Sequence, residues 1–440
     1  EITTRLVGSE MCIRDSSDTM KISTKTLIAL AALILTFPAL KAQNSVTPYS
    51  MYGYGILNDR ATSMQRQMGG VGIAQTGGRQ INAMNPASYA SIDSLTFLFD
   101  MGADVSMLWS KEDDKSERKT GGGLDYLAMQ FPFSRHMGGS IGLIPYSSVG
   151  YAFGSDIVHG TRQNQGTGGI NQAYAGVAGQ WFGLSIGANF CYNFGTITNA
   201  LYAVPQNETS SLFEHVMQIR DFDITLGLQY SKRWNRTNRA TIGFIYSPKM
   251  SMHGTTWATF QNITSSTTKA DTVGLQHMGG RYYRPNTFGV GLSYSHDRTS
   301  HFMVEADFLY QDWSKAKYEP LLDADGKVLF EGMNFNNRWR VGLGAEYTPK
   351  TRGSYLKKIT YRIGAYYVND YLQIHGNKVK EYGVSCGFGF PTPEGKTLIN
   401  LGLEYKHRQA SPQKLVSENY FNITLGVNFN EIWFWKRKIR

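Results

Sequence analysis

Much of the chain alternates between apolar residues and polar or glycine residues. Phe288, Val290 and Leu292 alternate with threonine, glycine and serine, and the same period of two returns in residues 301–311. Successive side chains of a β-strand point to opposite faces, so a period of two predicts strands rather than helices. The short segment between the two stretches, residues 296–299, predicts a hairpin turn.

The pattern recurs along most of the chain and predicts fourteen strands. We expect them at residues 95–108, 123–133, 138–150, 170–180, 183–197, 217–232, 238–252, 283–295, 300–314, 336–349, 357–371, 379–390, 397–409 and 417–429. Short turns are expected at residues 134–137, 181–182, 233–237, 296–299, 350–356 and 391–396. Longer linkers are expected at residues 109–122, 151–169, 198–216, 253–282 and 315–335, and the last two connections are shorter, near 372–378 and 410–416.

The alternation of short and long connections indicates what the apolar face meets. A transmembrane barrel has short turns at one end and long loops at the other, with apolar side chains facing lipid and polar side chains lining the lumen. A soluble β-sandwich also alternates, but it has no reason to sort its connections by length. We therefore predict an all-β fold, a 14-stranded antiparallel transmembrane β-barrel over residues 95–429.

The two ends of the chain do not follow the strand pattern. Residues 1–19 have no periodicity, and we interpret them as translated adapter sequence. Residues 20–42 have the layout of a signal peptide, with Lys21 and Lys25 before an apolar run that is too short for a membrane-spanning helix. We therefore expect export. A basic and aromatic extension, residues 430–440, follows the last strand at the periplasmic mouth.

A further segment, residues 43–94, lies between the signal peptide and the first strand. It combines glycine pairs with a short helix that we expect near residues 61–67. One interpretation is a flexible periplasmic tail. The other is a hatch that plugs the lumen, because a fourteen-stranded barrel is wide enough to need one. We predict the hatch.

Composition and motifs favour neither catalysis nor nucleic-acid binding. The net charge of +10 is spread through the chain, without a basic run interleaved with aromatic residues. Residues 183–187, GLSIG, match a nucleophile signature, but they lie within a strand and lack the strand-to-helix turn that this signature needs. The nine histidines lack metal-ligand spacing, and the acidic residues of 111–119 lack the spacing of a calcium loop. We predict no catalytic residues, no cofactor and no metal site.

The cysteines of the predicted strands give one geometric expectation. Cys191 falls in the polar set of its strand and Cys386 in the apolar set. Their side chains should therefore point to opposite faces of the wall, so we expect no disulfide between them.

Several motifs occur in a characteristic order. Asn85, Pro86 and Ala87 form an NPA motif, preceded by the glycine-rich sequence MGGVGIA at residues 68–74. With the features described next, this order resembles the FadL-type outer-membrane transporters of hydrophobic compounds in Gram-negative bacteria. The NPA motif looks like the one in the hatch of that family.

The second half of the chain adds to the resemblance. Pro285 leads one strand, and Asp307 lies in the next, which is followed by Trp313. This arrangement is similar to a pair of strands in the FadL-type family. Residues 337–349 and 361–367 look like the family's paired late strands. The basic extension after the last strand departs from the pattern of many barrels, which end at a terminal aromatic residue.

The resemblance implies a function. Family members take up hydrophobic compounds passively: an outer site captures the ligand, the hatch shifts, and the ligand leaves sideways through a gap in the wall. A related branch of the fold serves as a shuttle for proteins secreted by the type IX system, and this role stays open for the present chain. We expect a monomer in the bacterial outer membrane whose partners are membrane lipid and a hydrophobic small molecule. Under the alternative, a periplasmic or secreted protein is the partner.

Two groups of residues are candidates for the site. Gly142 and Pro145 lie in the third predicted strand, which in the family is kinked and forms the lateral opening. Proline cannot donate a ladder hydrogen bond, so Pro145 predicts an interruption, although the end of an ordinary strand could also hold it. A set of charged residues falls on the lumen face and could form a polar track or latch, or could simply pack the plug. These residues are Glu305, Asp307, Arg338, Arg340, Glu346, Arg362, Glu404 and Lys406.

Overall fold

The structure is a computed structural model that describes residues 47–157, 160–205, 210–263, 270–350, 353–392 and 397–432. The expected signal peptide, the first 19 residues and residues 433–440 of the C-terminal extension lie outside these described residues. In the described part of the chain, no helix is long and apolar enough to cross a membrane.

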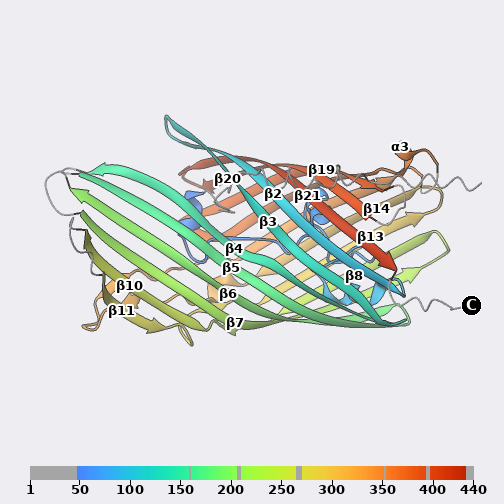
Figure 1. The fold of residues 1–440 in the computed structure, drawn as a ribbon, viewed down its shortest axis with the longest axis horizontal. Helices are drawn as coiled ribbons and strands as arrows, with labels where there is room; N and C mark the ends of the chain where they lie inside the picture. Colours follow the sequence, from blue (N-terminus) through green and yellow to red (C-terminus); the bar gives the residue numbers. More distant parts are fainter. Residues whose placement is uncertain are drawn as a thin grey trace, which may run out of the picture. The chain divides into compact units, whose positions relative to one another are not determined.

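Fourteen strands form a closed antiparallel ring, as the alternation predicts (Figure 1). They are β2 (Thr96–Glu112), β3 (Lys115–Ser134), β4 (Met137–Ile157), β5 (Gly160–Trp181), β6 (Leu184–Pro205), β7 (Ser210–Arg233), β8 (Asn238–Ser247), β13 (Thr287–Asp297), β14 (His301–Gln311), β17 (Arg338–Thr348), β18 (Thr360–Ile374), β19 (Asn377–Pro391), β20 (Thr397–Ser411) and β21 (Ser417–Ile432). Each strand pairs with the next, and β21 pairs with β2 from Thr96↔Ile432 to Lys111↔Ser417, which closes the barrel.

The long linkers differ from the prediction, because strands fill most of them. The strands β4 to β7 are 21 to 24 residues long and continue well beyond their alternating parts. Within the expected linker 253–282, β10 (Gly254–Ile263) pairs with the outer part of β7 and with β11 (Ala270–His277). The extension of β5, residues 160–169, is polar or glycine throughout, whereas those of β4, β6 and β7 mix polar and apolar residues without the regular alternation on which the prediction depended. Backbone pairing to a neighbouring strand satisfies their hydrogen bonds without it.

Several short elements complete the connections. The small sheet of β9 (Met250–Ser251) and β12 (Tyr283–Arg284) lies beside β8 in sequence, and β15 (Leu321–Leu322) pairs with β16 (Val328–Phe330). The 3-10 helix η3 (Trp313–Lys315) follows β14, and the helix α3 (Tyr355–Lys358) lies in the β17–β18 turn.

The two faces of the wall are assigned as the sequence predicts. On the outside, Val290 is 37% exposed and Leu425 is 48% exposed. On the inside, Asp307 is 5% exposed and Asn428 is 3% exposed. A soluble protein shows the reverse, so this apolar outer face belongs in lipid and the fold is a transmembrane barrel. Cys191 is buried inside and Cys386 is exposed outside, which confirms that they face opposite ways.

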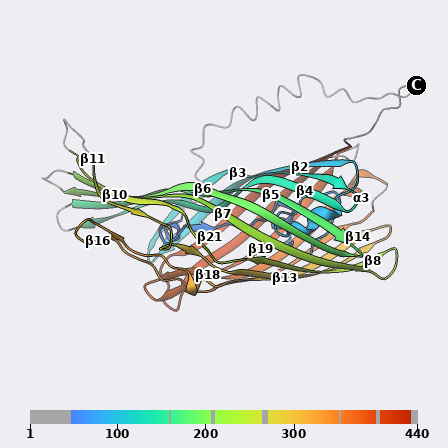
Figure 2. The same cartoon turned by 90° about the horizontal axis from the view of Figure 1, so that it is seen from below.

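The N-terminal segment, residues 47–95, contacts the inside of the ring, and we call it the plug. Its elements are η1 (Pro48–Met51), β1 (Ile56–Leu57), α2 (Ser63–Gln67) and η2 (Pro86–Ser91). The helix η2 contacts β3 to β7, whereas α2 contacts β18 to β21. A segment that touches both sides of a closed ring lies within it, and Figure 2 shows its blue trace between the green and the orange strands. The helix expected near residues 61–67 is α2, which starts with a capping box of Thr62 and Gln65.

Candidate functional site

The NPA motif caps one helix of the plug and ties it to a second part of the plug. The Asn85 side chain accepts a hydrogen bond from the Ala87 backbone N–H at 3.0 Å, which caps η2, and donates to the Ile73 carbonyl at 2.7 Å. Pro86 at the first position of η2 needs no hydrogen-bond partner there. One asparagine therefore joins two distant parts of the plug.

Inward-facing glycines of the wall make room for the plug backbone. A Cβ atom on Gly364 would lie 2.0 Å from the carbonyl carbon of Met68, and one on Gly243 would lie 2.1 Å from the Ile73 carbonyl oxygen. Plug and wall thus touch backbone to backbone, which larger inward residues would prevent. The sequence contains this signal as glycines at inward positions of β8 and β18, but its meaning depends on knowing what lies inside.

Two predicted lumen carboxylates hold the plug by its backbone. Asp307 accepts hydrogen bonds from the backbone N–H groups of Gly72 at 2.7 Å and Ile73 at 2.9 Å. Glu305 accepts one from Ala74 at 2.7 Å. Three consecutive plug amides therefore face two neighbouring acids on β14.

Two predicted arginines on the neighbouring strands β17 and β18 also hold the plug. Arg340 donates to the carbonyl oxygens of Gly69 at 2.6 Å and Gly70 at 2.9 Å. Arg362 donates to the Gln67 side chain at 2.9 Å and pairs with Glu346. These contacts hold residues 67–74, and we call the whole segment 61–95 the plug core.

The remaining predicted charges lie outside this set of contacts. Glu404 accepts hydrogen bonds from the Tyr366 hydroxyl at 2.6 Å and from the Asn422 side chain at 2.8 Å. The Lys406 ammonium lies 4.6 Å from the centre of the Tyr420 ring. Both residues line a cavity beside the plug rather than binding it.

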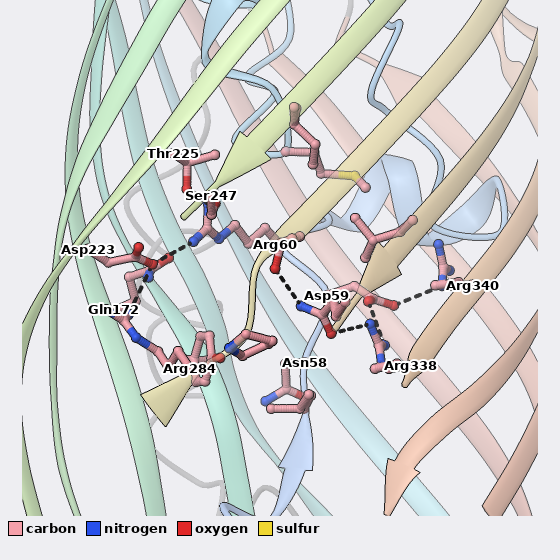
Figure 3. A pocket seen from close by; sticks show the side chains of 18 of the residues that line it. Asn58, Asp59, Arg60, Gln172, Asp223, Thr225, Ser247, Arg284, Arg338 and Arg340 are labelled. Atoms are coloured by element: carbon pink, nitrogen blue, oxygen red, sulfur yellow. Dashed lines mark hydrogen bonds and ion pairs between the residues drawn. The ribbon is translucent and has the colours of Figure 1, made fainter. Parts of the chain in front are cut away.

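The first part of the plug, residues 47–60, crosses the lumen as a strap. Asp59 forms ion pairs with Arg338 and Arg340, each at 3.1 Å, and Arg60 donates to the Thr225 hydroxyl at 2.7 Å on the other side (Figure 3). Burial alone would raise the pKa of Asp59, but the two guanidinium groups outweigh it and lower this pKa to about 2. Sequence reasoning found Arg338 and Arg340 but missed their partner, because Asp59 lies in an irregular segment.

Two internal cavities share the strap as a wall. One has a volume of about 100 Å³ and is drawn in Figure 3. The other, of about 130 Å³, is more highly charged. Leu57, Asn58 and Asp59 line both cavities. The smaller cavity extends to Pro145 and Tyr146 of β4 and so reaches the barrel wall.

The wall at that point has an incomplete ladder, which we call the seam. The strands β3 and β4 pair from Ser134↔Met137 only as far as Leu127↔Leu143. Beyond it, the strap's β1 takes the place of β3, pairing Ile56 with Ser148 and Leu57 with Ser147.

The candidate residues Gly142 and Pro145 lie at the start of the seam. Gly142 belongs to the last pairs with β3, where a Cβ atom would lie 2.6 Å from the Tyr174 ring. Pro145 follows the end of that pairing, and the register with β5 shifts between Pro145 and Ser147. The strand β4 itself continues to Ile157, so the expected interruption falls in its ladder with β3 rather than in the strand. Proline's missing N–H is consistent with this position.

An aromatic cluster lies over the strap at the loop end of the barrel. Tyr54 of the strap packs against Trp313 and Tyr318, with ring centres 5.9 and 5.4 Å apart. Trp313 also packs against Tyr371 at 4.5 Å, and Tyr54 and Trp313 are fully buried. We call this cluster the aromatic lid. The strap is therefore attached to β4 at the seam, to the charged residues that line the cavities and to the aromatic lid.

The chain was compared with protein families and with curated sequences. A family model described as BamG matches residues 23–440. No protein in the comparison with curated sequences matches the chain.

Solved structures show the same barrel. The CymD monoaromatic hydrocarbon channel is 15% identical, with a TM-score of 0.56 over 85% of this chain and 99% of that one. The toluene transporter TodX of P. putida is 14% identical, with a TM-score of 0.58 over 86% and 100% of the two chains. A Pseudomonas aeruginosa FadL homologue is 10% identical, with a TM-score of 0.57 over 85% and 99%. At these identities the likeness establishes the fold, and it confirms the FadL-type resemblance of the sequence.

Proposed function

We propose that this chain, which belongs to the BamG family, is a passive outer-membrane channel that binds small hydrophobic molecules and releases them sideways through the seam. The observation that carries the proposal is the position of the smaller cavity. It lies between the strap and the seam, and Leu57, Pro145 and Tyr146 form its wall. Leu57, the residue of β1 that lines the cavity, is paired with Ser147 of β4 at the seam.

The straight path through the lumen is the less favourable exit. The plug core blocks it with hydrogen bonds to Asp307, Glu305 and Arg340 and with backbone contacts against inward glycines. The lateral path needs only the displacement of a short strand. It also spares an apolar ligand contact with water, which costs ~25 cal/mol for each Å² of apolar surface.

The cavity size favours a ligand with a single ring. Its volume of about 100 Å³ is of the order of the apolar cavity of roughly 150 Å³ that binds benzene in another protein. Its lining includes Ile73, Ile245 and Leu309, whereas Asp59 and Asp223 are paired with arginines. The names of the CymD and TodX structures refer to monoaromatic hydrocarbon and toluene. A long fatty acid fits only if the strap moves.

A crosslink between β1 and β4 tests the lateral route. Leu57 and Ser147 are direct partners in the β1–β4 pair, and such Cα distances suit a disulfide. We expect Leu57→Cys with Ser147→Cys, in a background without Cys191 and Cys386, to block uptake of labelled toluene into proteoliposomes. Reduction should restore uptake.

A matched control pairs Ser106→Cys with Asn422→Cys, which are direct partners in the complete β2–β21 ladder. This crosslink should leave uptake unchanged. Full uptake with the β1–β4 crosslink closed rules out the seam as the exit.

The second candidate is a protein-binding or shuttle role for the same fold. The observation that favours it is the length of the outer extensions, because β7 has 24 residues where roughly 9–11 suffice to cross a membrane. The tip of the β2–β3 hairpin is also exposed on both faces. The second role is favoured if the uncrosslinked protein takes up no hydrophobic probe and a protein partner binds the β2–β3 hairpin.

A further inference from the structure

The β17–β18 turn carries an exposed basic cluster. The Lys350 backbone N–H donates to the Lys357 carbonyl oxygen at 2.8 Å, which brings the two ends of the turn together. Lys350 and Lys357 are exposed and Lys358 is half-buried, and none of them forms an ion pair within the described residues. In the same turn Leu356 is 71% exposed. Unpaired lysines beside an exposed apolar side chain suit an interface that is both anionic and apolar.

The outer wall of the same strands contains a shallow apolar groove. Its volume is about 590 Å³, and it extends over β14 and β17 to β21. The groove exists because small side chains interrupt a wall of large ones. Its principal outward residues are Leu343, Ala345, Ile363, Ala365, Val384 and Cys386.

The distance between the turn and the groove matches the distance between the headgroup and the acyl chains of a membrane lipid. Ala345 precedes Lys350 by five residues of chain, about 16 Å when extended. Half of the hydrocarbon core of a bilayer is about 15 Å thick. Between them Tyr347 and Tyr361 are direct partners and are 46% and 40% exposed, as aromatic residues at a membrane interface are.

We propose that this part of the outer wall binds an anionic glycerophospholipid of the leaflet at the short-turn end. Lys350, Lys357 and Lys358 hold the phosphate, Tyr347 and Tyr361 lie at the level of the glycerol, and an acyl chain fills the groove. The site depends on the transmembrane barrel and not on the proposed channel function. Lipid is favoured over an acidic protein because the groove faces the hydrocarbon, where acyl chains are already present.

The site can be tested with the full barrel in detergent, by native mass spectrometry with added phosphatidylglycerol and phosphatidylcholine. The wild-type protein should retain phosphatidylglycerol preferentially. The variant K350Q/K357Q/K358Q should lose this preference by roughly tenfold or more, because each cation near a membrane surface contributes on the order of fivefold. The matched control K111Q/K115Q/K378Q removes three lysines at the other end of the barrel, and its preference should remain.

A second variant separates a lipid from a simple phosphate ion. Ala365→Phe fills the groove with a side chain that is common on this outer face, and it should lower retention of both lipids. Millimolar inorganic phosphate should displace neither. If the lysine variant keeps the wild-type preference for phosphatidylglycerol, or if the control variant loses that preference equally, the lysines do not form a headgroup site. If phosphate displaces the lipids and Ala365→Phe does not lower their retention, the groove does not bind an acyl chain. If the lysine variant loses a bound acidic protein instead of lipid, the partner is a protein and the proposal is wrong.

Discussion

The plug core and the strap are both buried inside one barrel, yet they are attached in different ways. The core, residues 61–95, lies against glycine backbone and receives charged hydrogen bonds from several strands. The strap, residues 47–60, is held by two β1 pairs, by Asp59 and Arg60, and by the aromatic lid. The Asp59 side chain is 29% exposed to the adjoining cavities, whereas Asp307 is almost fully buried.

The difference indicates which part can move. Backbone contact at the inward glycines leaves the core little room to move, because at those points no side chain lies between wall and plug to rearrange. The strap adjoins empty volume on both sides, so it can shift without breaking the core. We therefore assign closure of the lumen to the core and control of the seam to the strap.

The largest expected effect is that of removing both parts. Deletion of residues 44–94 should leave a foldable barrel with an open lumen, because the wall closes through its own ladders. Single-channel conductance in planar bilayers should rise severalfold over that of the full chain. Unchanged conductance contradicts a plug that fills the lumen.

A smaller effect is expected from loosening the core alone. Asp307→Asn removes the charge from the group that accepts the N–H groups of Gly72 and Ile73. The loss should destabilise core docking by about 2 kcal/mol, the scale of a hydrogen bond to a charged group. Hydrogen exchange of peptides covering residues 68–74 reports it, and these peptides should exchange faster while the strap is unaffected. If Asp307→Asn speeds hydrogen exchange in the strap and leaves residues 68–74 unchanged, the assignment of this contact to the core is wrong.

A still smaller effect is expected from the strap. Asp59→Asn removes the carboxylate from two ion pairs with almost fully buried arginines, and it should destabilise strap docking by about 2 kcal/mol or less, because the Asp59 side chain is itself 29% exposed. Toluene uptake should increase slightly, with core exchange unchanged. A loss of uptake on this substitution means that Asp59 binds the ligand rather than restraining the strap.

The pH dependence of the strap has a definite sign. The pKa of Asp59 is lowered to about 2, so its ion pairs contribute fully above its ordinary value of 3.8 and are lost as the pH falls through about 2. Amide hydrogen exchange of the strap, corrected for its intrinsic pH dependence, should therefore show no change between pH 4 and 8 that comes from titration of Asp59. A transition near neutral pH that Asp59→Asn abolishes contradicts this assignment.

The sequence predicted the barrel well because lipid imposes a simple rule on it. Outward residues such as Val290 and Leu425 must be apolar, and the period of two then gives both strand number and faces. The same parity placed Asp307 and Arg340 in the lumen. It did not reveal that their partners are backbone groups of residues 69–73, since backbone atoms leave no signal in a sequence.

The seam and the strap could not be predicted in this way. The seam depends on where β3 and β4 stop pairing, and Pro145 marks only its neighbourhood. Asp59 and Arg60 lie in an irregular segment, so neither period nor spacing relates them to strands more than a hundred residues away. The outer extensions of β4 to β7 were missed because they lack a regular alternation of apolar and polar residues.

Hydrogen exchange with and without toluene tests the central claim most directly, since strap and core are compared within one molecule. The Asn58 N–H donates to the Tyr146 carbonyl oxygen at 3.0 Å across the seam, whereas those of Gly72 and Ile73 bind Asp307. The account predicts that toluene speeds exchange at Asn58 and leaves Gly72 and Ile73 protected. Faster exchange at Gly72 and Ile73 while Asn58 stays protected would contradict it, because the core and not the strap would then be the moving part.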